Sequence, residues 1–478
     1  MFEDYDIVIG LEVHAELKTK TKVFCSCKNE FGSEPNSNCC PVCVGLPGAL
    51  PVLNKRAVEL TIKAGHTIGS SISPIAVFER KNYFYPDLAK AYQISQLEKP
   101  ICVGGKIVLD SGKEIRINRI HLEEDAGKLV HKNDKIGTLI DYNRGGVPLI
   151  EMVTEPDISS AEEAVEFLMK YRSNLVFGDI ADCKMEQGGM RCDVNLSVKK
   201  KGSKVLGTRT EMKNLNSFKM VQRAIEFEAR RQIEEIEAGK VVVQETRKWD
   251  DNRGKSFAMR SKEEAQDYRY FPDPDILSVE ISDKVIEDIK KTLPELSYQK
   301  RQRYVEELGL PAYDAKILTS EKYICEYFEK VLDKVKLPKV VSNWVMTEVL
   351  AKCKEKAVES LEEVISVKNL AYIIKAVQDK EITRINGKEL FEDACFADFD
   401  AEKEAKARGM VVKMSDEDLA RFIEEVMSEN SGAIADYKDN PVKVENFFIG
   451  SLMKKTQGKA NVEKARPIIH QRLENSIK

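Results

Sequence analysis

The sequence predicts an α+β protein in which an N-terminal, antiparallel-sheet half is followed by an all-α half. Before about residue 280, glycine and proline are frequent, and apolar residues recur with the period of two that is typical of strands. After Ser282 no convincing strand pattern remains, and stretches with helical periodicity follow one another. A chain of 478 residues is long enough for about two to four domains with substantial cores.

Strand-like alternation begins close to the N-terminus. From Ile7 to Leu17 the odd positions are apolar, whereas Glu12, His14 and Glu16 occupy even positions. Glu12 and His14 therefore share the polar face of one strand. The first strand is expected over residues 5–17, and further strands over residues 101–109, 115–123, 147–153, 190–198, 205–213 and 240–247.

One long helix is expected to interrupt these strands. Ser217 is a natural N-cap, an apolar stripe runs from Phe218 to Ile236, and Gly239 lies just past the end. Later helices are expected over residues 297–308, 321–334, 339–352, 367–378, 416–428 and 442–456. A charged stretch that ends at Gly409 suggests a joint, so the predicted domains are 1–290, 291–410 and 411–478.

The polar faces of these strands collect carboxylates and imidazoles. Glu12 and His14 lie on the first strand, while Glu151 and Asp193 occur in two later strand-like segments. Carboxylates beside a neutral imidazole suit a hard divalent cation, above all Mg²⁺ with nucleotide phosphate oxygens completing its shell. The alternative is an ordinary solvated face of an antiparallel sheet, which is the more common situation for any one strand alone.

Two close pairs of cysteines form the most specific motif. Cys25 and Cys27 are followed, across a loop, by Cys40 and Cys43. Four thiolates at this spacing suit tetrahedral Zn²⁺ in a closed, structural site. Cys39 could compete for the metal, although the C-x-x-C spacing favours Cys40, and a disulfide or incidental free thiols are the alternatives.

The segment from Arg80 to Tyr92 combines cations and aromatic residues around Pro86, which favours a loop. Arg80 and Lys81 could hold phosphates there, and a tyrosine could stack on a base. An ordinary surface loop is equally compatible with this segment.

The sequence has no phosphate-binding P-loop, no dinucleotide fingerprint and no amidase-type serine loop. A net charge of −4 and the absence of a membrane span or leader favour a cytoplasmic protein without a general attraction for nucleic acid.

Taken together, these motifs resemble those of the B subunits of bacterial glutamyl/aspartyl-tRNA amidotransferases. The resemblance extends over nearly the whole chain, from IGLEVHAEL at residues 9–17 through HLEEDAGK at 121–128, DYNRGGVPLIEMVTEPD at 141–157, EMKNLNSF at 211–218 and DYRYFPDPD at 267–275. It implies a cradle domain followed by helical and tail domains. Departures occur at Val462, where the family commonly has proline nearby, and around residues 385–406; some relatives also lack the cysteines.

The resemblance also implies a reaction and partners. An amidase-like glutaminase, known as the A subunit, would release ammonia, and a small C subunit would join it in a heterotrimer. The B-type chain would use ATP and Mg²⁺ to phosphorylate the side-chain carboxylate of Glu-tRNA(Gln) or Asp-tRNA(Asn), and ammonia would then form the amide. A non-catalytic, zinc-stabilised RNA-binding protein and a stand-alone metal-dependent hydrolase are the alternatives.

Residue roles follow from the same resemblance. The implied metal ligands are Glu12, His14, Glu124, Glu151 and Asp193. Lys81 would face a phosphate or carboxylate, and Lys90 with Glu124 would border the ammonia route. Simple alternation places Glu123 beside His121, so the role of Glu124 requires a bulge or a turn after Leu122.

The C-terminal segment is locally basic. Residues 442–478 contain eight Lys and Arg against three Glu, a charge of +5 within a chain of −4. Lys454, Lys455 and Lys459 follow an apolar helical stripe near Gly458, so this end is predicted to grip the tRNA backbone. An ordinary pair of solvated helices is the alternative.

Overall fold

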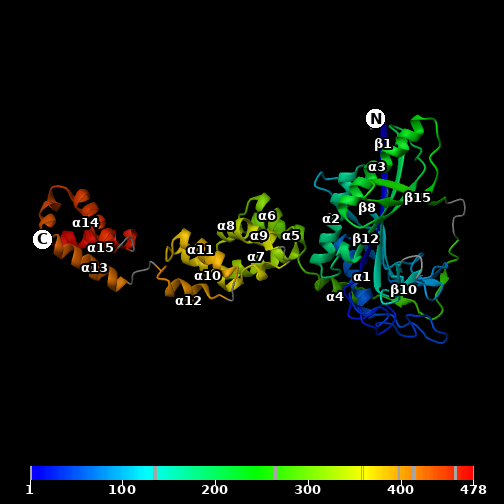
Figure 1. Cartoon of the computed structure of the whole chain (residues 1–478), viewed down its shortest axis with the longest axis horizontal. Coiled ribbons are helices and arrows are strands. Elements are labelled where there is room, and N and C mark those ends of the chain that lie inside the picture. The colour runs from blue at the N-terminus through cyan, green and yellow to red at the C-terminus, as the bar shows by residue number, and fades with distance from the viewer. Residues whose placement is uncertain are drawn as a thin grey trace. The chain divides into compact units, whose positions relative to one another are not determined.

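The computed structural model describes residues 3–132, 137–261, 267–356, 358, 360–396, 399–411, 416–456 and 460–476. It divides into two compact units, Met1–Gln299 and Lys300–Lys478. The first contains the described strands together with four complete helices, and the second is helical (Figure 1). The predicted α+β class, with a sheet-rich N-terminal part and a helical C-terminal part, is confirmed. The predicted boundaries at residues 290 and 410 stay predictions.

A ten-stranded sheet organises the first unit. Along its main path the order is β15-β14-β13-β12-β1-β11-β8-β6-β2, and β7 pairs with β8 beside this path. The strands are β1 (Tyr5–Glu16), β2 (Ser71–Ile72), β6 (Cys102–Val103), β7 (Lys106–Val108), β8 (Glu114–Glu124), β11 (Pro148–Thr154), β12 (Met190–Lys200), β13 (Thr210–Leu215), β14 (Glu245–Asp250) and β15 (Lys255–Ser261).

The described pairs of this sheet are antiparallel, as expected, with the exception of β13 and β14, which are parallel. The helix α3 (Phe218–Glu237) connects these two strands. A parallel neighbour requires a crossover of this kind, because the chain must return to the same end of the sheet. Smaller sheets are formed by β16 (Phe271–Pro272), β4 (Glu79–Asn82) and β5 (Tyr92–Ser95), by β9 (Lys128–His131) and β10 (Thr138–Asp141), and by β3 (Ile75–Ala76) and β17 (Val279–Glu280).

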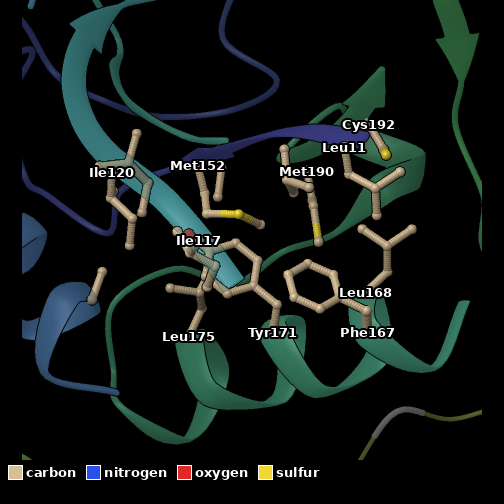
Figure 2. Close-up of a cluster of buried hydrophobic side chains, with 14 of the residues drawn as sticks. Leu11, Ile117, Ile120, Met152, Phe167, Leu168, Tyr171, Leu175, Met190 and Cys192 are labelled. Atoms are coloured by element: carbon tan, nitrogen blue, oxygen red, sulfur yellow. The ribbon is translucent and has the colours of Figure 1, made fainter. Parts of the chain in front are cut away.

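Helices cover one face of the large sheet. The helix α2 (Ala161–Phe177) directs Phe167, Tyr171 and Leu175 toward sheet residues that include Met152 and Met190 (Figure 2). All five of these side chains are fully buried. This apolar layer leaves the opposite face of the central strands to carry their polar residues.

The expectation that only one helix interrupts the strands was wrong. The helix α3 was predicted correctly: Ser217 accepts a hydrogen bond from the Met220 amide, and Gly239 follows with φ +73°. However, α1 (Lys55–Thr67) and α2 also lie within the strand-rich part, and α4 (Asp283–Lys291) follows it.

The second unit consists of short helices. They are α5 (Ser297–Glu306, which begins at the end of the first unit), α6 (Ala312–Leu318), α7 (Lys322–Val335), α8 (Pro338–Trp344), α9 (Leu350–Lys356), α10 (Val367–Gln378), α11 (Arg384–Ala394), α12 (Ala401–Ala407), α13 (Asp416–Glu429), α14 (Pro441–Lys455) and α15 (Val462–Ser476). A π-helical turn, Val345–Val349, joins α8 to α9. Among the described residues, no helix is long and apolar enough to cross a membrane.

Candidate active site

The polar face of four central strands carries the predicted metal ligands with the exception of Glu124. Across β12, β1, β11 and β8, one row of the sheet contains Arg191, His14, Glu151 and His121 as direct neighbours. Because side chains on directly paired residues point to the same face, these four side chains converge. The alternation expected from the sequence therefore brings together residues that are far apart along the chain.

The first cluster combines two imidazoles with two carboxylates. His14 Nε2 lies 3.2 Å from Glu151 Oε2 and 3.8 Å from Glu123 Oε1. His121 Nε2 lies 3.5 Å from Glu123 Oε2 and 3.6 Å from Glu151 Oε2. His14, Glu123 and Glu151 each offer an atom within 4.8 Å of the others, which is a suitable spacing for one shared cation.

Electrostatics in this cluster favour charged groups despite burial. Burial lowers the pKa of His14, but a hydrogen bond to Glu151 and the charges of Glu151 and Glu123 outweigh it and raise this pKa to about 8. Burial acts to raise the pKa of Glu151, yet the charges of His121 and His14 hold it well below its ordinary value. These carboxylates thus form a negative centre that a cation stabilises.

Lys81 faces the same cluster from β4. Burial acts to lower its pKa, but the charges of Glu123 and Glu151 and the neighbouring tyrosines raise it. Its Nζ lies 5.0 Å from the ring centroid of Tyr268 and 5.9 Å from that of Tyr83. The Tyr268 ring also meets Tyr270 edge-on at 6.2 Å. The sequence predicted Lys81 here, but it gave no indication that Tyr268 and Tyr270 would surround it.

A second acidic cluster lies beside the first along β1. Glu12, Asp193 and Glu211 offer oxygen atoms that all lie within 4.8 Å of one another. Lys213 Nζ lies 2.6 Å from Asp193 Oδ2 and 3.0 Å from Glu211 Oε1. The structure therefore divides the predicted ligand set: Glu12 and Asp193 belong to this cluster, while His14 and Glu151 belong to the other. Glu211 was not predicted as a ligand, although its segment EMKNLNSF was part of the resemblance.

Glu124 lies apart from both clusters. The β8–β11 register is regular from Ile120 to Glu124, so neither the bulge nor the turn expected after Leu122 is present there. The Glu124 carboxylate instead contacts Lys90 Nζ and accepts a hydrogen bond of 3.0 Å from the Ile94 amide. Of the two adjacent glutamates, the structure places Glu123 with His14, and it places Glu124 with Lys90.

Arg80 is held by acidic partners rather than directed toward the two clusters. Its Nε donates to Asp273 and its Nη2 donates to Asp275, each at 2.8 Å. The guanidinium also lies 4.2 Å from the ring centroid of Tyr92. Its predicted role in phosphate binding stays a prediction, and these contacts indicate that Arg80 holds the segment after β16 against β4 and β5.

The four predicted zinc ligands meet at one point. Cys43 Sγ lies 3.5 Å from Cys25, 3.7 Å from Cys40 and 3.8 Å from Cys27, sulfur to sulfur. Tetrahedral zinc with Zn–S bonds of about 2.3 Å requires sulfur separations of roughly 3.8 Å, so the cluster fits this metal. A hydrogen bond from Cys25 is the main cause that lowers the pKa of Cys43 to about 4. Cys39 Sγ lies near Asn143 Oδ1 at 3.7 Å and is not part of the cluster.

Comparison with known proteins places the chain in a family. A family model described as the GatB/GatE catalytic domain matches residues 7–287, and one described as the GatB domain matches residues 326–473. The chain is 50% identical to the B subunit of the aspartyl/glutamyl-tRNA(Asn/Gln) amidotransferase of Caldicellulosiruptor bescii, over 98% of this chain and 99% of that protein. It belongs to the family of amidotransferase B subunits.

Other relatives of this family match over the same extent. The B subunits of the aspartyl/glutamyl-tRNA(Asn/Gln) amidotransferases of Caldicellulosiruptor saccharolyticus and Thermoanaerobacter pseudethanolicus are 49% and 46% identical, each over 98% of this chain and 99% of the relative. The resemblance inferred from the motifs is thus confirmed. Membership makes the chain one component of a tRNA amidotransferase, which is a ligase-type enzyme of protein biosynthesis.

Proposed function

We propose that this chain activates the side-chain carboxylate of Glu-tRNA(Gln) or Asp-tRNA(Asn) with ATP and converts it to the amide with ammonia. The observation that carries the proposal is the pair of acidic clusters on one sheet face, with Lys81 directed at one of them. A free carboxylate is a poor acyl donor, and phosphoryl transfer to it depends mainly on alignment and charge neutralisation. Two cation sites beside a lysine provide these requirements.

The residues of each cluster have separate roles in this proposal. His14, Glu123 and Glu151 would hold one Mg²⁺, and Glu12, Asp193 and Glu211 would hold a second. When bound, ATP would supply the phosphoryl group and Mg²⁺ would neutralise its charge. Lys81 orients the oxygen atoms of the substrate carboxylate and neutralises their charge. The rings of Tyr83 and Tyr268 lie beside the ammonium group of Lys81.

The ammonia step involves the opposite side of β8. Lys90 and Glu124 form a largely buried ion pair there, with the rings of Phe24 and Tyr92 beside the ammonium. We assign this pair to the end of the route along which ammonia arrives from the amidase-like A subunit, and a small C subunit would complete the heterotrimer. The thiolates of Cys25, Cys27, Cys40 and Cys43 would hold a structural Zn²⁺.

The test is phosphate release from ATP by the reconstituted enzyme, measured with and without misacylated tRNA. Release that requires Glu-tRNA(Gln) or Asp-tRNA(Asn) supports the proposal. Release without any tRNA would indicate a stand-alone hydrolase, and tRNA binding without release would indicate a non-catalytic RNA-binding protein.

A variant of the first cluster links this activity to the site. His14→Ala should lower tRNA-dependent phosphate release by about 100-fold or more, because a ligand of the charge-neutralising cation is lost. Glutamine hydrolysis by the glutaminase partner should persist. His131→Ala, on the exposed hairpin of β9 and β10, is the matched control. Near-normal amide formation by the His14 variant would refute the site assignment.

A further inference from the structure

Lys22 is a buried lysine beside the cysteine cluster. Its side chain is fully buried, with an exposed fraction of 0%. Its Nζ donates to Cys43 Sγ at 3.4 Å and to the Tyr142 carbonyl oxygen at 3.1 Å. Among the residues that the structure describes, no carboxylate forms an ion pair with it. The positive charge therefore has one sulfur atom and one carbonyl group as its polar partners.

A buried ammonium group is stable only when nearby negative charge replaces the water it has lost. Four thiolates around Zn²⁺ carry a net charge of −2. An ammonium donating to one of these sulfur atoms lowers the combined charge to −1. Lys22 and a zinc–thiolate centre therefore stabilise each other, and this part of the inference rests on the zinc site proposed above.

Lys22 also connects the cysteines to the loop of residues 141–147. The Tyr142 carbonyl accepts from Lys22, and the Gly146 carbonyl accepts from the amide of Val23 at 2.9 Å. On its other side the loop holds the residues that follow Glu124. Gly146 N donates to the Asp125 carbonyl and Asp125 N donates to the Val147 carbonyl, each at 2.9 Å. The loop thus lies between the cysteine cluster and the end of β8.

A second contact reaches the partner of Glu124 directly. Gly45, two residues after Cys43, has φ +65° and packs against Lys90. A Cβ atom at this position would lie 2.9 Å from Lys90 Cγ and 3.2 Å from Lys90 Cα. Because those separations are too short for any side chain, the cysteine loop approaches Lys90 as closely as its backbone permits.

We propose that Lys22 is a positioning residue that neutralises the zinc–thiolate centre and ties it to the loop of residues 141–147, so that the zinc-binding segment holds the Lys90–Glu124 pair in place. Two connections support this role: Lys22 acts on Glu124 through the loop, and Gly45 acts on Lys90 by contact. The zinc site then has a task in the ammonia step as well as in folding.

The first experiment measures zinc release from the full chain. Lys22→Met keeps an unbranched side chain that is one atom shorter, and it removes the charge and the donor. We expect zinc to transfer to a chromogenic chelator about 10-fold to 100-fold faster than from the wild type, because groups that support metal ligands typically contribute 10-fold to 100-fold in metal affinity. Lys20→Met, which alters an exposed lysine two residues earlier, should release zinc at the wild-type rate.

A spectroscopic readout separates this role from a general loss of stability. In the Co²⁺-substituted chain, the hydrogen bond from Lys22 lowers the energy of the sulfur lone pair. The thiolate-to-cobalt absorption band should therefore move to longer wavelength in Lys22→Met and stay unchanged in Lys20→Met. A band at the wild-type position in the Lys22 variant would overturn the proposal.

The coupling to Lys90 is tested by the amide formed per phosphate released in the reconstituted enzyme. Gly45→Ala leaves Lys22 intact and displaces Lys90, so this ratio should fall several-fold while phosphate release continues. Lys22→Met should show the same change, and Lys20→Met should not. An unchanged ratio in Gly45→Ala would refute the positioning role.

Two further outcomes distinguish the zinc site from the role of Lys22. A reduced wild-type chain without zinc would refute the zinc proposal and remove the basis of the inference. Equal zinc release from the wild type and Lys22→Met would refute the role of Lys22 alone.

If Lys22→Met does not fold, amine labelling of the wild type provides the measurement. Lys22 should become reactive when zinc is removed, and Lys20 should react equally in both states. Continued protection of Lys22 without zinc would contradict the proposal.

Discussion

Glu123 and Glu124 are adjacent on β8, yet their side chains serve different faces of the sheet. Glu123 lies against His14 and His121, whereas Glu124 contacts Lys90 and the amide of Ile94. Period-two alternation alone accounts for this arrangement, because the β8–β11 register is regular here. One strand therefore supplies Glu123 to the proposed site of phosphoryl transfer and Glu124 to the proposed end of the ammonia route.

This division predicts different defects for two neighbouring substitutions. Glu123→Gln should lower tRNA-dependent phosphate release by about 100-fold, because it removes a carboxylate from the proposed Mg²⁺ site. Glu124→Gln should retain most phosphate release and lose amide formation, because it breaks the pair with Lys90. Parallel assays of phosphate and of amidated tRNA measure both effects. Equal loss of phosphate release in the two variants would contradict the division.

Glu228 on α3 is the centre of a buried polar network that has no part in the proposed reaction. Its carboxylate is fully buried and accepts hydrogen bonds from Arg231, Thr210, Gln232 and Ser256. Burial acts to raise its pKa, but the hydrogen bonds and charge of Arg231 hold the pKa below its ordinary value. The carboxylate therefore contributes stability above its ordinary pKa, and this contribution is lost as the pH falls through the lowered value.

Glu228→Gln should lower the free energy of unfolding of the first unit by about 3 kcal/mol at pH 7, because it removes the fully buried carboxylate that pairs with both Arg231 and Arg247, which then keep only Glu235 and Glu245 as counter-charges. The difference from the wild type should become smaller on acidification below about pH 4. Urea unfolding followed by Trp249 fluorescence in a Trp344→Phe background reports on this unit. Glu226→Gln, on the exposed side of the same helix, should have little effect. A difference independent of pH would refute the ionised network.

At the scale of elements, α3 shows how far local signals determine a helix. Ser217 accepts a hydrogen bond from the Met220 amide at 3.1 Å, and Val221, Ile225 and Ile233 are buried. Ser217→Ala should cost about 1 kcal/mol of stability in the first unit, because one amide at the helix start loses its partner. Ser217→Asp retains an acceptor and should keep wild-type stability. The same fluorescence measurement applies, and equal losses in both variants would show that the hydroxyl acts in another way.

Local patterns predicted the elements that carry clear periodicity and missed those that do not. Residues 190–198 were predicted as a strand and lie within β12, and α3 was predicted from cap to end. In α1, Thr61, Lys63 and Gly65 are buried along with the apolar residues, so its buried face is not marked by apolar residues alone. The missed helix α2 does have a start signal: Ser160 accepts from the amide of Glu163, and serine with glutamate three residues later forms a capping motif.

The candidate site was predictable only to the extent that single strands determine it. Alternation placed Glu12 with His14, and it also favoured Glu123 over Glu124. By contrast, the proximity of Glu211 to Asp193 depends on how β13 pairs with β12, and that of Tyr268 to Lys81 depends on a distant loop. Such pairings are set by tertiary structure, because no local pattern in the sequence specifies which segments become neighbours.

At the scale of the whole molecule, the catalytic and tRNA-binding tasks are assigned to different units. The proposed active site lies within residues 1–299, and the basic C-terminal segment belongs to residues 300–478. Within that segment, α13, α14 and α15 enclose an apolar cluster that includes Leu419, Phe448 and Ile469. This packing gives α14 a fixed apolar face and leaves its other residues for contacts outside the cluster. Residues 457–459, which include the predicted lysine at 459, lie outside the described residues.

The lysines of α14 differ in their availability for RNA. Lys455 Nζ lies 2.9 Å from Glu425 Oε2 and also contacts Glu429, so α13 already neutralises it. Lys443 and Lys454 are exposed and have no ion pair among the described residues. The predicted grip on tRNA phosphates is therefore best assigned to Lys443 and Lys454, a distinction that the count of charges in the sequence does not make.

Replacing Lys443 and Lys454 together by Ala should weaken tRNA binding by the full chain, because each lost phosphate contact also removes the release of condensed counterions. The slope of log affinity against log salt should become less steep by about 1.5, at roughly 0.7 to 0.9 for each contact. Lys455→Ala should leave this slope nearly unchanged, because its charge is already balanced by Glu425 and Glu429. Tryptophan fluorescence titrations at several salt concentrations measure these values.

Phosphate release at saturating tRNA should be retained in the double variant, because both lysines lie outside the unit that contains the proposed active site. An unchanged salt slope in the double variant would place tRNA recognition elsewhere.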